Sequence, residues 1–267
     1  MPGFRKSRKE IAFTALMICF AVVSPADARV YRVNGSAVAS GDGGSWSAPL
    51  DEAGFAAALS GAASGDEFWI AKGVYRPVIP ASADAISTVE QGKSFTLGNG
   101  VALYGGFVGS ETAREQRDPD KHCVVLTGDL GLDDGRDARG VTLSADVIRG
   151  TNSKSVLKGT NVKGVRLDGI AVSGGEGGLG GGLNLSESDV VIENCLFQGN
   201  KGTNGAAINI GIPRPPQGSG TASLYIRDSR FLENRSTGSL GGSINTVRSE
   251  VKLFRSRFEG NATGAYK

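Results

Sequence analysis

The sequence predicts an all-β fold, a β-solenoid in which short strands stack coil upon coil as parallel sheets. Four segments with alternating apolar residues align with one another, at 165–172, 190–197, 224–231 and 251–258. The last three end in Phe-x-x-Asn, and glycine-rich second strands follow at 181–185, 205–210 and 241–246. The 267 residues include 41 glycines without a collagen-like triplet period, which fits a fold with many tight turns.

The N-terminus has the pattern of a secretory signal peptide at residues 1–28. Four basic residues between Arg5 and Lys9 precede an apolar run at 11–23, which ends before Ala26-Asp27-Ala28. The run is shorter than the ~20 residues that span a bilayer. We therefore expect cleavage after Ala28, export of the chain, and no membrane-spanning segment in the mature protein.

Residues 29–66 form the predicted N-terminal segment, which contains one amphipathic helix at 50–59 after Pro49. We expect this helix to cap the first coil, because a solenoid end exposes unpaired strand edges. The β-helix itself is expected over 67–267, beginning with a strand pair within 65–75. Further strands are predicted at 94–97, 101–104, 123–126 and 155–157, with polar loops at 76–93, 110–122 and 129–153.

The spacing of the repeats excludes helical crossovers between the parallel strands. The repeated phenylalanines are 34 and 27 residues apart, and the longer interval holds a proline-rich insertion at 213–216. A crossover needs about a dozen residues, and the turns here are too short for a helix. Stacked coils satisfy this constraint, and connections between parallel strands are right-handed as a general rule.

Two sets of repeated residues are predicted to form ladders along the stack. Phe197, Phe231 and Phe258 are expected to stack inward. Three asparagines follow at an offset of three, where each strand turns. They are expected to adopt left-handed backbone geometry and to hydrogen-bond from coil to coil. These residues are Asn200, Asn234 and Asn261.

The predicted opening coils contain the segments at 69–75, 95–107, 109–112, 126–130 and 167–170. On these residues the chain resembles bacterial secreted right-handed parallel β-helix proteins of the pectin-lyase-like superfamily. The Phe-x-x-Asn and Gly-Gly-x-Ile elements are similar to the repeats of polymorphic outer-membrane proteins. The resemblance implies a secreted or surface-exposed protein, often a passenger or adhesin. Because the sequence stops where the next Gly-Gly-x-Ile strand would begin, we expect a β-helix truncated at its C-terminal end.

The charge balance argues against nucleic acid as a partner. Four of the 29 basic and two of the 27 acidic residues lie in the predicted signal peptide, which leaves 25 of each. His122 is the only histidine, so metal sites built from two histidines are excluded. Cys123 and Cys195 either pair or are ordinary small apolar residues.

An acid-rich loop is the one candidate metal site. Clustered carboxylates suit calcium, but the loop lacks an EF-hand spacing and contains Arg136, so a solvated loop is favoured over a calcium site. No other cofactor is expected. The loop contributes Asp129, Asp133, Asp134 and Asp137.

The leading interpretation is a non-catalytic exported or surface β-helix protein, an adhesin or passenger-like scaffold. Its partner would be an extracellular glycan or a host or cell-surface protein. The alternative is a β-helix that binds or cleaves polysaccharide as a lyase or hydrolase, although no catalytic residue is identified. Arg230 and Arg257 are stacked by the alignment and are the candidate contacts to an acidic glycan. Four aromatic residues either stack on sugars or seal the first coils, namely Trp46, Trp69, Tyr75 and Tyr104.

Overall fold

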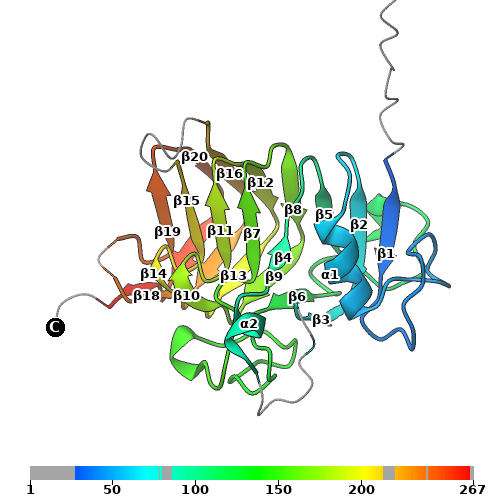
Figure 1. Ribbon diagram of the computed structural model, residues 1–267, viewed down its shortest axis with the longest axis horizontal. Helices are drawn as coiled ribbons and strands as arrows, with labels where there is room; N and C mark the ends of the chain where they lie inside the picture. Colours follow the sequence, from blue (N-terminus) through cyan, green and yellow to red (C-terminus); the bar gives the residue numbers. More distant parts are fainter. Residues whose placement is uncertain (1–27, 78, 80–85, 213–219, 239, 265–267) are drawn as a thin grey trace, which may run out of the picture.

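The computed structural model describes residues 28–77, 79, 86–212, 220–238 and 240–264. The predicted signal peptide up to residue 27 and the proline-rich insertion lie outside these residues. The chain folds as a parallel β-helix, with four sheets that run along one axis (Figure 1). All pairings between the described strands are parallel, as the repeat spacing predicts, except for isolated bridges in loops.

Each aligned repeat crosses two of the sheets. Its first half lies in a seven-stranded sheet, made of β1 (Val30–Val33), β2 (Glu67–Ala71), β5 (Ala102–Phe107), β8 (Val165–Asp168), β12 (Asp189–Glu193), β16 (Ser223–Arg227) and β20 (Glu250–Phe254). Its second half lies in a six-stranded sheet, made of β3 (Gly73–Tyr75), β6 (Val124–Thr127), β9 (Ile170–Ser173), β13 (Leu196–Gln198), β17 (Arg230–Leu232) and β21 (Arg257–Glu259). The predicted register is confirmed, because Ile192 pairs with Ile226 and Phe197 pairs with Phe231.

The glycine-rich second strands form a five-stranded sheet, made of β4 (Phe95–Thr96), β7 (Leu157–Thr160), β11 (Leu183–Ser186), β15 (Ile208–Gly211) and β19 (Ile244–Val247). A fourth sheet was not predicted, and it contains β10 (Glu176–Leu179), β14 (Lys201–Asn204), β18 (Arg235–Ser236) and β22 (Ala262–Thr263). The sequence pattern predicts turns at these positions, because the segments are short and have few apolar residues. They form strands because each one pairs with the equivalent segment of an adjacent coil.

The predicted helix at 50–59 is present as α1 (Glu52–Ser60). The side chain of Asp51 caps it by accepting the N–H of Gly54, and Phe55 and Leu59 are buried. In the first coil, α1 lies where later coils have a strand of the five-stranded sheet, and it contacts β4 (Figure 1). The unpredicted strand β1 is the edge of the seven-stranded sheet beyond β2. A second helix, α2 (Thr88–Gln91), and 3-10 turns at Arg114–Gln116 and Ala145–Val147 lie in the predicted polar loops.

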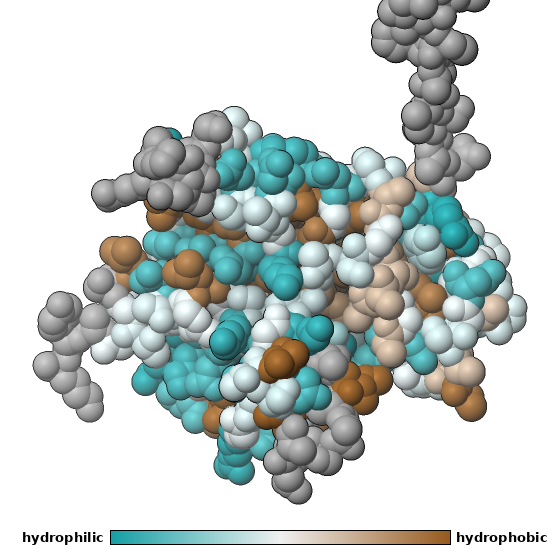
Figure 2. Space-filling view, in the orientation of Figure 1, coloured by the Kyte–Doolittle hydropathy of each residue, from teal (hydrophilic) through white to brown (hydrophobic). Residues whose placement is uncertain are grey.

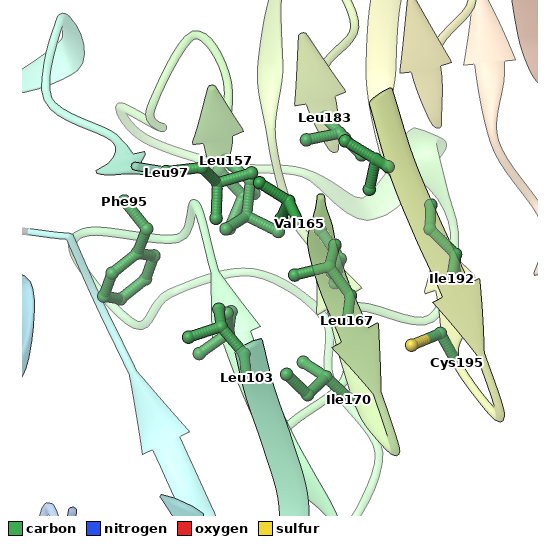
Figure 3. Close-up of a cluster of buried hydrophobic side chains, with 14 of the residues drawn as sticks. Phe95, Leu97, Leu103, Leu157, Val165, Leu167, Ile170, Leu183, Ile192 and Cys195 are labelled. Atoms are coloured by element: carbon green, nitrogen blue, oxygen red, sulfur yellow. The ribbon is translucent and has the colours of Figure 1, made fainter. Parts of the chain in front are cut away.

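The core is a column of apolar side chains that fills the space between the sheets. Figure 3 shows leucine, isoleucine and valine side chains from successive coils pointing into this common interior. The phenylalanine stack is confirmed, with ring centroids 5.2 Å apart for Phe197 and Phe231 and 4.7 Å apart for Phe231 and Phe258. Phe231 is fully buried, whereas Phe258 in the last coil is 45% exposed.

The asparagine ladder is confirmed, but its predicted left-handed backbone is wrong. Asn200 donates its side-chain amide to Asn234 Oδ1 at 3.0 Å, and Asn234 donates in the same way to Asn261 at 2.9 Å. The positive φ angles belong to the preceding residues, Gly199 (63°) and Glu233 (53°). The residue before each asparagine makes the bend, which leaves the asparagine free to turn its amide inward.

Two further features are the state of the two cysteines and the length of the helices. Cys123 and Cys195 are both free thiols, and Cys195 is buried. None of the helices within the described residues is long and apolar enough to cross a membrane.

Truncating the phenylalanine stack should cost more inside the helix than at its last coil. Phe231→Ala removes a ring packed on both faces, so we expect a loss of ~3–5 kcal/mol in the free energy of unfolding. Phe258→Ala should cost clearly less, because that ring is already half exposed. Urea denaturation of the two variants measures the difference, and equal losses would contradict the stacking energetics.

Candidate functional site

The acidic loop brings three of its four predicted ligands together. Carboxylate oxygens of Asp129, Asp133 and Asp134 all lie within 4.8 Å of one another. Asp129 is fully buried and accepts the backbone N–H groups of Asp133 and Asp134 at 3.0 and 3.1 Å. Asp137 is not part of this group, because its carboxylate pairs with Arg139 at 2.7 Å.

Asp134 holds the long loop at 129–153 together. Its carboxylate accepts hydrogen bonds from Thr142 Oγ1 at 3.0 Å, Asn152 Nδ2 at 3.1 Å and the backbone N–H of Arg149 at 2.7 Å. Burial raises the pKa of Asp134 to about 6, and the nearby charge of Asp129 adds to this rise. The hydrogen bonds act in the opposite direction and offset part of the cost of burial.

The donor set of this loop partly suits calcium, which prefers oxygen ligands. The buried Oδ1 of Asn152 has no hydrogen-bond partner among the described residues. However, the guanidinium of Arg136 lies 3.6 Å from Asp129 and already supplies positive charge there. Calcium binding by Asp129, Asp133 and Asp134 therefore stays a prediction.

The predicted arginine column is present on the outer face of the six-stranded sheet. Arg230 pairs in register with Arg257, and both side chains are exposed. The guanidinium of Arg257 forms an ion pair with the carboxylate of Glu259 at 2.5 Å. Arg230 has no ion pair within the part of the chain that the structure describes. Binding of an acidic glycan at this column stays a prediction.

Three of the four aromatic candidates are buried, and Trp46 is half-buried. Trp69 is 7% exposed and stacks on Phe107, with centroids 5.1 Å apart. Tyr104 is equally buried, and the guanidinium groups of Arg114 and Arg117 lie 4.7 and 5.4 Å from its ring centroid. With so little exposed ring surface, Trp69 and Tyr104 are not open platforms for sugar rings.

Arg114 and Arg117 border an open cleft of about 570 Å³ on the outer face of the seven-stranded sheet. The sequence analysis missed this site. The carboxylates in and beside it are ion-paired. Arg117 binds Asp168 at 2.7 Å, while Glu193 pairs with Arg166 and, at 2.7 Å, with Arg227. Glu193 and Arg227 lie opposite each other in the register of β12 and β16. The charges of this cleft therefore largely satisfy one another.

A second open groove, of about 420 Å³, lies on the outer face of the five-stranded sheet. Its floor carries a row of asparagines that point away from the core, and these bond to one another. Asn209 donates to Asn184 at 3.1 Å, and Asn245 donates to Asn209 at 2.8 Å. All its lining residues are uncharged, namely Leu179, Asn184, Leu185, Ser186, Asn204, Asn209, Gly211, Ile212, Leu240, Asn245 and Val247.

The sequence analysis missed this outward row, although its signal is present. The second strands read Leu-Asn-Leu, Ile-Asn-Ile and Ile-Asn-Thr, with one asparagine at the same outward position in each coil. Period-2 alternation with a constant polar residue identifies such a row once the strands are placed in register.

The comparisons with known proteins do not assign the chain to a family. No protein-family model matches the sequence, and no curated protein matches it significantly. A crystal structure of the pectate lyase Pel9A is 16% identical, and the alignment covers 85% of this chain and 78% of that one. Its TM-score is 0.20, so the likeness carries no argument about activity.

The raised pKa of Asp134 predicts a pH-dependent stability. The carboxyl keeps its proton in the folded state up to about pH 6, whereas the unfolded chain loses it near the usual value of about 3.9. The free energy of unfolding should therefore fall as pH rises from about 4 to about 6, by up to about 3 kcal/mol from this group. Urea denaturation at several pH values measures the slope.

The matched variants are Asp134→Asn and Asp137→Asn. The first should flatten the slope between about pH 4 and pH 6, because it removes the titrating group. The second should keep the slope, since the pKa of Asp137 is lowered and it titrates below this window. Identical slopes for the wild type and Asp134→Asn would show that Asp134 does not titrate as described.

Proposed function

We propose that the chain is an exported, non-catalytic right-handed β-helix scaffold, of the adhesin or passenger type, which binds an extracellular glycan or a cell-surface protein. The observation that supports this most is the uncharged groove on the five-stranded sheet. It offers hydrogen-bonding amides and apolar side chains, and none of the lining residues that the structure describes is titratable. Such a lining suits binding and supplies no general acid or base.

The arrangement of carboxylates also favours binding over cleavage. Glycoside hydrolysis needs two carboxyl groups ~5–9.5 Å apart and available to substrate. On the seven-stranded sheet, Asp168 and Glu193 are held by arginines and are at most 7% exposed. A lyase or hydrolase, the alternative function, would have to break these ion pairs before either carboxylate reached a substrate.

The purified mature protein should bind an extracellular glycan or cell surface without cleaving it. Polysaccharides, neutral and acidic, are incubated with the protein, and binding is measured beside the release of reducing ends and of unsaturated sugar products. We expect binding and no release above the blank. Time-dependent release that disappears in Asp168→Asn would overturn the proposal in favour of an enzyme.

The predicted export has a structural consequence at Arg29. Its backbone nitrogen donates at 2.9 Å to Asp66, a carboxylate that is only 3% exposed. Cleavage after Ala28 would turn this nitrogen into a charged α-ammonium group. The buried carboxylate would then form an ion pair with the new N-terminus, which is stronger than a hydrogen bond between neutral partners.

Intact-mass measurement of the exported protein should give an N-terminus at Arg29. In addition, Asp66→Asn should destabilise the form that begins at Arg29 by about 1 kcal/mol more than the uncleaved form, because only the former loses an ion pair. Equal losses in the two forms, or a mass that retains residues 1–28, would refute this account of maturation.

A further inference from the structure

We propose that the groove on the five-stranded sheet binds an uncharged polysaccharide, which lies along the helix axis over the row of asparagines on its floor. This inference rests on the proposed function, since it names the ligand class of the same groove. The residues that carry it are the row Asn184, Asn209 and Asn245 with the apolar border of Leu179, Leu240 and Val247.

The asparagine row has hydrogen-bonding capacity left for a ligand. Each amide offers two N–H donors and an oxygen with two lone pairs. The ladder uses one donor of Asn209 and one of Asn245, and one acceptor of Asn184 and one of Asn209. Each amide therefore keeps an unused donor and an unused acceptor, which match sugar hydroxyl groups because these both donate and accept. Asn209 is only 8% exposed, so the half-buried Asn184 and Asn245 are the amides that a ligand reaches.

The borders of the groove are apolar and open to solvent. Leu179 is 46% exposed, Leu240 54% and Val247 42%. Figure 2 shows this face, where hydrophobic residues border hydrophilic ones at the left, over the five-stranded sheet. Side chains of this kind pack on the C–H surfaces of pyranose rings, while the floor binds their hydroxyl groups.

Among the residues that the structure describes, the groove lining carries no charged side chain, which selects against ionic ligands. A carboxylate or sulfate placed there would lose water without gaining an opposite charge. The uncharged row spans three coils and is bounded by Lys158, which pairs in register with Asn184. At a coil spacing of ~4.8 Å, this length fits an oligosaccharide of about three residues in contact.

A peptide strand is a poorer fit to this surface than a sugar chain. Extended peptides gain affinity by pairing their backbone with a free sheet edge. The groove lies on a sheet face, where the backbone groups of β11 and β15 already pair with neighbouring strands. A peptide there would have only side-chain contacts, and its own backbone groups would lose water without partners.

The test measures binding of the full mature protein to hexasaccharides by calorimetry. Neutral probes are β-1,4-linked glucose, xylose and mannose oligomers, and charged probes are oligogalacturonate and heparin fragments. The variant Val247→Asp places a charge on the exposed border of the groove. The matched control is Val38→Asp, at a fully exposed valine outside the lining.

We expect at least one neutral oligomer to bind, Val247→Asp to weaken it about tenfold or more, and Val38→Asp to change it less than about twofold. Binding of charged probes only, lost in Val247→Asp, would overturn the ligand class and leave the scaffold function standing. Neutral binding that Val247→Asp leaves unchanged, or no binding of any neutral probe, would also overturn this inference. Cleavage of a bound oligomer would instead overturn the non-catalytic function.

Discussion

Stacking of equivalent positions from coil to coil is the constraint on which the rest of the structure depends. The buried asparagines express it most clearly. Asn234 accepts from both the backbone and the side chain of Asn200 and donates to the carbonyl of Phe197. Each amide thus satisfies buried polar groups of the coil before it, and a slip in register would leave several of them unpaired. The phenylalanine rings stack in the same register and fill the space beside this ladder.

The register that serves the core also arranges the outer faces, because side chains alternate along each strand. On the seven-stranded sheet it aligns Glu193 with Arg227, and two arginines from the loop after β5 pair with Glu67 and Asp168. On the five-stranded sheet it aligns asparagines and leaves the row uncharged. The same coil-to-coil register therefore produces two different faces. The face of the seven-stranded sheet carries charges that pair with one another, and the face of the five-stranded sheet carries amides with unused hydrogen-bonding capacity.

The long loop and the first coil complete the scaffold by covering surfaces that the repeats leave open. The loop at 129–153 packs Val141 against Val125, Ala171 and Leu196 on the outside of the six-stranded sheet. Asp134 ties this loop internally with three hydrogen bonds, at the cost of burying its carboxylate. In the first coil, α1 places Phe55 against Phe68, Tyr75 and Phe95. In later coils, stacked leucines and isoleucines fill the corresponding part of the core.

The sequence by itself determined the repeating strands, their parallel stacking, and the phenylalanine and asparagine ladders. These features follow from local alternation and a constant offset, which every coil repeats. Only the tertiary structure decided that Lys201–Asn204 is a strand, that Glu233 and not Asn234 takes the left-handed turn, and that Asp137 lies apart from Asp129. It also decided that Tyr104 is buried beneath arginines. The physical reason is that such features depend on neighbours from other coils and loops, whereas local alternation reports only which side of a strand is buried.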